Sequence, residues 1–389
     1  MISEPSLPHP GLIVLFGSGE TSPTGRKIFE GIMQKLPRSP RLVLLETPAG
    51  FELNSSRVIG RVGEFFSHRL QNHAPCVEII PARKRGTAYS PDNPQVVSPL
   101  LDADLIFMGP GSPSYAIRQL RDSLAWQYLI ARHRLGAVLA LASAATVAIS
   151  ACALPVYEIY KVGEELHWID GLDLFSLYGL RLVFVPHWNN QEGGAELDTS
   201  RCFMGQMRFM QLMEMLPDDM TIIGLDEKTA LIMDPANCEC HVRGLGKVTL
   251  IHTGHKHAPD SMSASQNPAS MLRGTDEDLV IIANQRHGHF HQYEDEDTFP
   301  MDEIGQFHAF HPETNLPSEI WQKALQSAND KRGASIPIPP LEVLSMVEAR
   351  QVARQRGEWA QADSIRLQVE KLGWKIVDTR DGPQIEKVS

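Results

Sequence analysis

The stretch AVLALASAATVAIS (residues 137–150) decides how the rest of the chain is interpreted. Its first six residues form an uninterrupted apolar run, which is typical of a strand buried on both faces of a sheet. The alanine-rich second half favours a closely packed helix, and Ser143 stands at the junction. Two interpretations of Ser143 follow: a nucleophile on a strand-to-helix turn, or one more small residue in a buried seam.

Apolar runs of the same kind recur between residues 12 and 234. They are LIVLF (12–16), RLVLLE (41–46), VEII (77–80), DLIFM (104–108), LVFVP (182–186), TIIGLD (221–226) and TALIMD (229–234). Segments with helical periodicity separate them, most clearly residues 24–36, where the apolar side chains fall on one face. Continuous apolar strands that alternate with helices predict an α/β fold, in which helices cover both faces of a mostly parallel sheet.

Several loops with functional residue types directly follow these predicted strands. They are Gly17–Glu20, Gly109–Ser112, Ser143 and His187. Functional loops of a parallel sheet lie at the carboxyl ends of its strands. We therefore expect these four segments to meet at one edge of the sheet.

Length and composition narrow the classes of function. A chain of 389 residues exceeds one ordinary core, so two or three domains are expected. The net charge of −11 argues against a general binder of nucleic acid or of anionic membranes. Five cysteines, an odd number, imply no disulfide framework and fit a reducing compartment, so we expect a cytoplasmic protein.

Two local patterns bear on metals and membranes. Cys238-Glu239-Cys240 has no second cysteine pair beside it, so we expect no metal site there and no cofactor. Residues 136–156 carry no charge and are long enough to span a bilayer. This run is rich in alanine and serine and contains Pro155, so it favours a buried sheet, and we expect no membrane contact.

Nucleophilic catalysis by a serine needs a base within hydrogen-bond reach and a carboxylate that holds the base in the right tautomer. His187 is the best candidate base because it ends an apolar strand. Glu158 is the first candidate for the carboxylate, and Glu164, Glu165 and Asp170 are alternatives. Any chain of this length offers several such sets, so purely structural roles for Ser143 and His187 stay open.

An acyl-transfer site also needs backbone N–H groups that bind the oxyanion. Ala144 follows Ser143 and supplies one candidate donor. Gly111 supplies another, because a glycine loop lets the backbone approach a substrate closely. Ser112, Gly19 and Glu20 complete the predicted oxyanion- and substrate-binding set.

Four segments besides the Ser143 turn resemble one family. They are FGSGE (16–20), DLIFMGPGSPSYAIRQL (104–120), VPHW (185–188) and GLDEKTALI (224–232), the last being the most specific match. Together they resemble the cyanophycinase and dipeptidase E family of serine peptidases, whose fold is related to that of class I glutamine amidotransferases. The resemblance covers about residues 11–255.

The resemblance implies a reaction and a set of residues. In that family a serine, an acid and a histidine act in this chain order, which implies Ser143 as nucleophile, Glu158 as acid and His187 as base. The implied reaction is hydrolysis of a short peptide or amide without a metal. Pro186, before the histidine, points to the dipeptidase branch rather than to the cyanophycinases.

The turn departs from the family pattern at two positions. The family has glycine two residues before and two residues after the serine, where this chain has Leu141 and Ala145. Glycines there relieve crowding around a strained backbone. The departure leaves a second interpretation, a non-catalytic relative that binds a peptide or amino-acid ligand in the same cleft.

The composition changes after residue 255, and three domains are expected: residues 1–255, a polar and partly ordered connection over 256–338, and a small domain over 339–389. The segment RHGHFHQYEDED (286–297) lies in the connection. A strand would place its His287, His289 and His291 on one face, where they could bind a metal ion. We favour the polar connection.

The C-terminal segment predicts two helices over residues 341–373, broken at Arg356-Gly357, and a hairpin after them. Residues 349–384 resemble the small C-terminal domain of cysteinyl-tRNA synthetases. This resemblance implies an RNA contact, while solvated helix faces or a protein-interaction module are the alternatives. The candidate phosphate ligands are Arg350, Arg354, Arg356 and Arg366. The peptidase resemblance also implies a homodimer.

Overall fold

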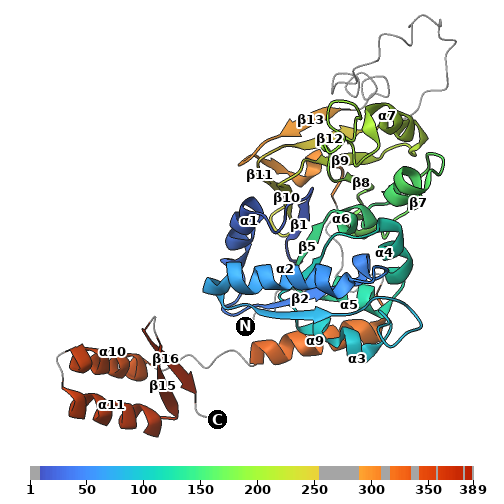
Figure 1. Cartoon of the computed structure of the whole chain (residues 1–389). Coiled ribbons are helices and arrows are strands. Elements are labelled where there is room, and N and C mark those ends of the chain that lie inside the picture. Colours follow the sequence, from blue (N-terminus) through green and yellow to red (C-terminus); the bar gives the residue numbers. More distant parts are fainter. Residues whose placement is uncertain are drawn as a thin grey trace, which may run out of the picture. The chain divides into compact units, whose positions relative to one another are not determined.

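A computed structural model describes residues 9–253, 289–307, 316–333, 341–355, 358–379 and 382–387. The chain forms two compact units, Met1–Ala328 and Asn329–Ser389. Each unit is described by itself (Figure 1).

The first unit is built on an eight-stranded sheet with the order β14-β11-β10-β1-β5-β4-β2-β3. Five neighbouring strands are parallel: β1 (Ile13–Phe16), β5 (Val138–Ala142), β4 (Leu105–Met108), β2 (Arg41–Leu45) and β3 (Cys76–Ile80). Three antiparallel strands extend the sheet beyond β1: β10 (Thr229–Asp234), β11 (Glu239–Gly244) and β14 (Thr298–Pro300). The predicted α/β fold with a large, mostly parallel sheet is thus confirmed.

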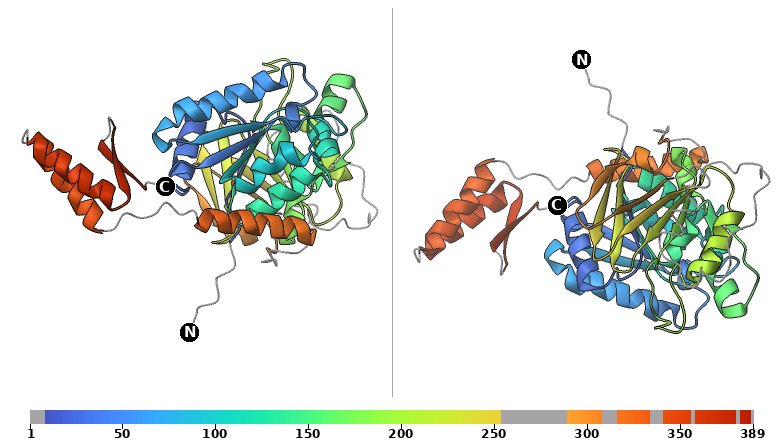
Figure 2. Two further views of the ribbon diagram at one scale, coloured as in Figure 1. Left: turned by 90° about the horizontal axis from the view of Figure 1, so that it is seen from below. Right: turned by 90° about the horizontal axis from the view of Figure 1, so that it is seen from above.

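Helices cover both faces of this sheet (Figure 2). They are α1 (Pro23–Met33), α2 (Ser55–Arg69), α3 (Pro94–Val97), α4 (Pro113–Leu120), α5 (Leu124–Arg134) and α9 (Ser318–Gly333). Alternate residues of a strand point to opposite faces, so β1 divides its side chains between two cores. Val14 and Phe16 pack with α1 and α2, whereas Ile13 and Leu15 belong to the core that includes α5 and α9.

A second sheet of four strands has the order β13-β12-β9-β8. Its strands are β8 (Leu182–Val185), β9 (Thr221–Leu225), β12 (Val248–His252) and β13 (Phe290–Tyr293). The β8–β9 pair is parallel, so both strands end at the same edge. The sequence runs of β8 and β9 resemble those of the main sheet, but here β8 pairs with β9, and β9 pairs with β12. Helix α7 (Gly205–Met215) packs on this sheet.

The first unit extends well beyond the expected domain limit at residue 255. Strands β13 and β14 pair with β12 and β11, so they are integral parts of the two sheets. Ile320, Trp321 and Ala324 of α9 are buried in the main core. Part of the segment predicted to be a connection therefore completes the first unit, because its apolar residues are needed to cover the sheet.

The histidine segment lies partly outside the described residues, which do not include His287. His289 directly precedes β13 and His291 lies on it, with ring centroids 6.4 Å apart. Within the described ranges, no group of three or more histidine, cysteine, aspartate or glutamate side chains is arranged to hold a metal ion. In the same part of the chain, none of the helices has the length and apolar character needed to cross a membrane.

The second unit consists of two helices and a hairpin, as predicted. The elements are α10 (Leu341–Gln355), α11 (Trp359–Lys371), β15 (Trp374–Thr379) and β16 (Gly382–Lys387). A small core of Val343, Val347, Val369, Trp374 and Ile376 holds them together. Gly373, at φ 81°, makes the turn from α11 into β15.

Candidate active site

Ser143 occupies a sharp turn between β5 and the short helix α6 (Ala144–Ala148). Its backbone angles, φ 52° and ψ −112°, lie in a region that residues with a side chain rarely adopt. Such a conformation costs on the order of 1–3 kcal/mol and persists only where surrounding contacts hold it. Here the Ser143 N–H donates to Phe16 O at 3.4 Å, and the Val147 N–H donates to Ser143 O at 3.1 Å.

The turn keeps this strained geometry without the two glycines of the family pattern. Leu141 is fully buried on β5, where it pairs with Leu15 on one side and Met108 on the other. Ala145 is also fully buried, in the same core cluster. Both side chains thus act as core residues, and neither relaxes the backbone at Ser143.

The imidazole of His187 lies next to the serine hydroxyl. His187 Nε2 is 2.9 Å from Ser143 Oγ. The histidine follows β8 by two residues and has a left-handed backbone, φ 52°. Its N–H donates to Gly17 O at 3.3 Å, which ties the end of β8 to the loop after β1. Three of the four predicted strand-end segments therefore meet at this point.

The other nitrogen of the imidazole contacts Glu227. His187 Nδ1 is 3.1 Å from Glu227 Oε1, and Asn190 Nδ2 donates to the same oxygen at 2.9 Å. The hydrogen bond to His187 holds the pKa of Glu227 below its ordinary value. An ionised carboxylate only accepts, so Nδ1 carries the proton and Nε2 is left to accept from the Ser143 hydroxyl.

The carboxylate beside His187 is thus Glu227, and the expectation that Glu158 would occupy this place is corrected. Glu158 begins a π-helical turn, Glu158–Val162, and its Oε1 accepts a short hydrogen bond from Ser114 Oγ. Of the alternative acids, Glu164 lies near His167 instead (3.8 Å). Residues around Glu158 follow Ser143 closely in the chain, but their segment folds against the N-terminus of α4.

Sequence reasoning missed Glu227 although it had the signal for it. Glu227 lies two residues after β9, in the GLDEKTALI segment that carried the strongest resemblance. Because β8 and β9 are parallel neighbours, the residues that follow them must lie side by side. The chain order serine, acid, histidine implies an acid before His187, whereas Glu227 follows it.

Gly111 and Ala144, the two residues predicted as oxyanion donors, both line the cleft at Ser143. Gly111 has φ 150°, and a Cβ there would lie 2.0 Å from Pro48 O, so only glycine fits. Ser112 differs: its hydroxyl accepts from the Tyr115 N–H at 3.1 Å and caps α4, and its own N–H donates to Pro48 O at 2.9 Å. These bonds indicate that Ser112 stabilises the structure of the loop.

The loop after β1 brings Gly19 and Glu20 close to the same edge. The Lys228 N–H donates to Ser18 O at 3.2 Å, and a Cβ on Gly19 would meet the Lys228 side chain at 2.9 Å. Burial raises the pKa of the Glu20 carboxyl, and the nearby His187 imidazole partly opposes this rise. Glu20 thus lies within electrostatic reach of His187.

The cleft itself is small, with a volume of about 50 Å³. Its lining includes Ser143, His187 and a set of mainly apolar neighbours. These neighbours are Gly111, Pro113, Ala144, Val147, Val156, Tyr157, Pro186, Cys202 and Phe203. The cleft therefore has room for a small side chain or for part of a larger one next to Ser143.

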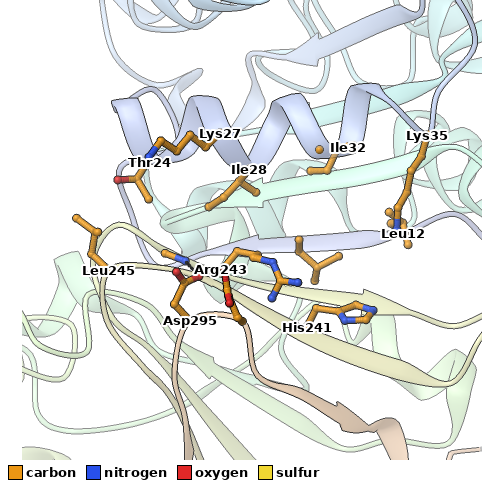
Figure 3. Close-up of a pocket in the computed structure, with 14 residues that line it drawn as sticks. Leu12, Thr24, Lys27, Ile28, Ile32, Lys35, His241, Arg243, Leu245 and Asp295 are labelled. Carbon is orange, nitrogen blue, oxygen red and sulfur yellow. Dashed lines mark hydrogen bonds between the residues drawn. The ribbon is translucent and has the colours of Figure 1, made fainter.

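A larger groove of about 510 Å³ lies elsewhere, between α1 and β11 (Figure 3). Lys27 of α1 and Lys35, two residues after α1, stand on one wall, His241 and Arg243 of β11 stand on the other, and Ile28 points into the groove. It shares no lining residue with the cleft at Ser143, and its described lining holds neither serine nor cysteine. The hydrogen-bonded serine therefore marks the smaller cleft as the candidate active site.

The fold is similar to that of a known peptidase. A crystal structure of a peptidase from an acI-B1 Actinobacterium aligns with a TM-score of 0.50 at 23% identity, covering 62% of this chain and 90% of that one. At this level of identity, the similarity shows the fold. No protein-family model matches the chain.

A short stretch of the chain is similar to curated cysteine–tRNA ligases. The protein from Chlamydia felis (strain Fe/C-56) is 49% identical over 49 residues, which is 13% of this chain. The protein from Methanosarcina mazei is 42% identical over 48 residues. The chain spans about a tenth of the length of these relatives.

Proposed function

We propose that the first unit is a serine hydrolase that cleaves a short peptide or amide through an acyl-enzyme on Ser143. The observation that carries this proposal is the continuous chain from Ser143 Oγ to His187 Nε2 at 2.9 Å and from His187 Nδ1 to Glu227 Oε1 at 3.1 Å. Its support also includes the strained turn at Ser143 and the likeness of the fold to a peptidase.

In the acylation step, Ser143 Oγ attacks the scissile carbonyl carbon while its proton moves to His187 Nε2. The imidazolium that forms is stabilised by the Glu227 carboxylate, which remains ionised. The backbone N–H groups of Gly111 and Ala144 are the candidate donors to the oxyanion, a contribution worth on the order of 10²–10³ in rate for each donor. The C–N bond then breaks as Nε2 returns the proton to the leaving amine.

In the deacylation step, a water molecule takes the place of the amine, and its oxygen attacks the acyl carbon while one of its protons moves to His187 Nε2. The resulting oxyanion collapses, the bond between the acyl carbon and Ser143 Oγ breaks, and the hydroxyl recovers its proton. The chain's own residues thus balance both half-reactions without a further reactant besides water.

The alternative is a non-catalytic relative that binds a peptide in the same cleft. One comparison separates the two functions: turnover of a dipeptide library by the wild type and by Ser143→Ala. Wild-type release of amino acids that is lost in Ser143→Ala supports the hydrolase. Calorimetric binding of a dipeptide to both proteins, with no turnover by either, supports the binding protein.

For the second unit we propose an RNA contact, on the basis of its resemblance to cysteine–tRNA ligases. The predicted phosphate ligands contribute unequally. Arg350 is only 5% exposed, so it serves the packing of α10. Arg366 pairs with Glu370 at 3.3 Å, and the Arg354 guanidinium lies over the Trp359 ring at 5.9 Å. Arg356 lies outside the described residues.

Filter binding of bulk tRNA tests this second role across a range of salt concentrations, because phosphate contacts weaken steeply as salt rises. The full chain should retain tRNA at low salt, and an Arg354→Glu variant should bind it less tightly. Retention that is equal in the two proteins, or absent from both, contradicts the proposal.

A further inference from the structure

The walls of the cleft beside Ser143 offer no partner to a charged side chain. Among the described residues that line it, none is a lysine, arginine, aspartate or glutamate. Val147 and Val156 contribute aliphatic surface, and Tyr157 and Phe203 contribute aromatic surface. Burying an unpaired charge costs several kcal/mol, so a substrate residue with an ionised side chain would enter at a large penalty.

Neither glutamate beside the cleft supplies the missing partner for an acidic side chain. Glu158 follows the lining residue Tyr157 in the chain, and its Oε2 is buried without a hydrogen-bond partner. Glu20 lies within electrostatic reach of His187. A carboxyl group cannot offset the charge of a substrate carboxylate, so the penalty for an acidic side chain stands.

The apolar wall around His187 is held in a fixed shape. Arg201, Cys202 and Phe203 have φ values of 56°, 57° and 68°, three left-handed residues in succession. Hydrogen bonds from their N–H groups to Trp188 O (2.9 Å), His187 O (3.2 Å) and Thr199 O (3.0 Å) hold this turn. Backbone strain of this kind persists where the surroundings over-determine it, often at functional sites.

The turn presents two uncharged side chains to the cleft. The Phe203 ring lies 5.9 Å from the His187 ring, measured between centroids. Burial raises the pKa of Cys202 to about 12, so its thiol stays protonated near neutral pH. A rigid, uncharged wall thus faces whatever flanks the scissile bond.

We propose that the cleft selects a small, uncharged, apolar residue, of the alanine, valine or leucine class, as the residue whose carbonyl is attacked. This inference rests on the proposed hydrolase function and names its substrate class. The small volume of the cleft, about 50 Å³, favours a compact side chain, and the uncharged lining favours an apolar one.

Diphenyl α-aminoalkylphosphonates test the inference because they phosphonylate an active serine at a rate set by their side chain. Ser143 Oγ forms a bond to phosphorus, phenoxide leaves, and His187 takes the serine proton. The leucine and aspartate analogues are close in size and differ in charge. The inference predicts that the leucine analogue reacts at least about a hundredfold faster with the wild type. Equal rates, or a faster aspartate analogue, overturn it.

A variant that adds a positive charge at the cleft provides a second test. It compares the ratio of the two reaction rates between the variant and the wild type. Tyr157 is 37% exposed, so Tyr157→Arg places a cation at the cleft without burying it fully. Val162, 73% exposed and outside the lining, provides the matched control Val162→Arg. Tyr157→Arg should narrow the ratio between the two analogues by about tenfold or more, and Val162→Arg should leave it unchanged. A ratio that both variants change equally contradicts a local effect at the cleft.

A small fluorophosphonate without an amino-acid side chain distinguishes the two possible failures. If it labels Ser143 while the aspartate analogue outpaces the leucine analogue, the specificity inference is wrong and the hydrolase function stands. If it does not label Ser143, the hydrolase function fails, and the specificity inference fails with it.

Discussion

His187 and Glu227 are 40 residues apart in the chain, yet Nδ1 of the first lies 3.1 Å from Oε1 of the second. The parallel pairing of β8 and β9 accounts for this contact, because both residues lie two positions beyond the ends of neighbouring strands. The pairing places the carboxylate on the side of the imidazole opposite Ser143, where it can hold the reactive tautomer.

This geometry predicts that Glu227→Gln impairs turnover far more than Glu158→Gln. The amide in Glu227→Gln would no longer favour the Nδ1–H tautomer, and losses on the order of 10⁴ in kcat are typical of such a change. Glu158 bonds to Ser114 rather than to His187, so its variant should lose less than about tenfold. Steady-state hydrolysis of the best dipeptide measures both. A larger loss of kcat in Glu158→Gln than in Glu227→Gln would indicate that Glu158 is the acid that acts with His187.

Opposite effects on stability are expected for two glutamates at this edge. The folded-state pKa of Glu227 is lowered, so its ionised form stabilises the fold above its unfolded pKa, and this contribution is lost as pH falls through the folded value. The folded-state pKa of Glu20 is raised, so ionisation of Glu20 destabilises the fold at neutral pH.

Thermal unfolding at several pH values checks these signs. At pH 7, Glu227→Gln should lower the melting temperature, and Glu20→Gln should raise it. The Glu20→Gln difference should shrink as the pH falls from the raised folded-state pKa of Glu20 to the ordinary carboxyl value. The Glu227→Gln difference should shrink at lower pH, as the pH falls from the ordinary value through the lowered folded-state pKa of Glu227. Shifts that do not depend on pH would point to packing rather than to charge.

The oxyanion assignment predicts a strong effect of Gly111→Ala. A methyl group at Gly111 would collide with Pro48 O, so the loop must move and the donor with it. We expect the phosphonylation rate of Ser143 to fall by about 10²–10³. Gly31→Ala is a suitable control, because nothing lies within 4 Å of a Cβ there, and the alanine should favour α1 slightly. A similar loss in both variants would contradict the assignment.

Leu141 and Ala145, the neighbours of the Ser143 turn, are expected to support stability and not to limit reactivity. Leu141→Gly removes a fully buried side chain from β5, so urea denaturation should give a loss of about 3–6 kcal/mol. The variant should label no faster than the wild type, because Ser143 already has the strained geometry. Faster labelling of folded Leu141→Gly would show that Leu141 restrains the nucleophile.

The sequence allowed the fold to be predicted, together with two of the three side chains that form the hydrogen-bonded chain at the candidate site. Short apolar runs that end in Gly17, Ser143 and His187 indicated parallel strands with a common edge, and these residues do meet there. Glu227 was not predicted because its position beside His187 depends on which strands pair. The apolar runs of β8 and β9 do not indicate that these two strands belong to a separate sheet. The φ values of residues 201–203 could not be predicted either, since none of the three is a glycine.

The domain limits also differ between the prediction from the sequence and the structure. The composition of residues 289–307 is polar, which favoured a connection between domains. Phe299 and Met301 are nevertheless buried, because β14 completes the edge of the main sheet beside β11. An edge strand needs few apolar residues, so its sequence carries a weak signal.

The most direct test of the account is the mass of the intact protein after treatment with a fluorophosphonate. Three proteins are compared: the wild type, Ser143→Ala and His187→Ala. The account predicts a single adduct on the wild type, located at Ser143 by peptide mapping, no adduct on Ser143→Ala, and a greatly slowed reaction of His187→Ala. A folded wild-type protein that gains no adduct, or gains one at a different residue, would contradict the claim that Ser143, His187 and Glu227 form a working nucleophilic site.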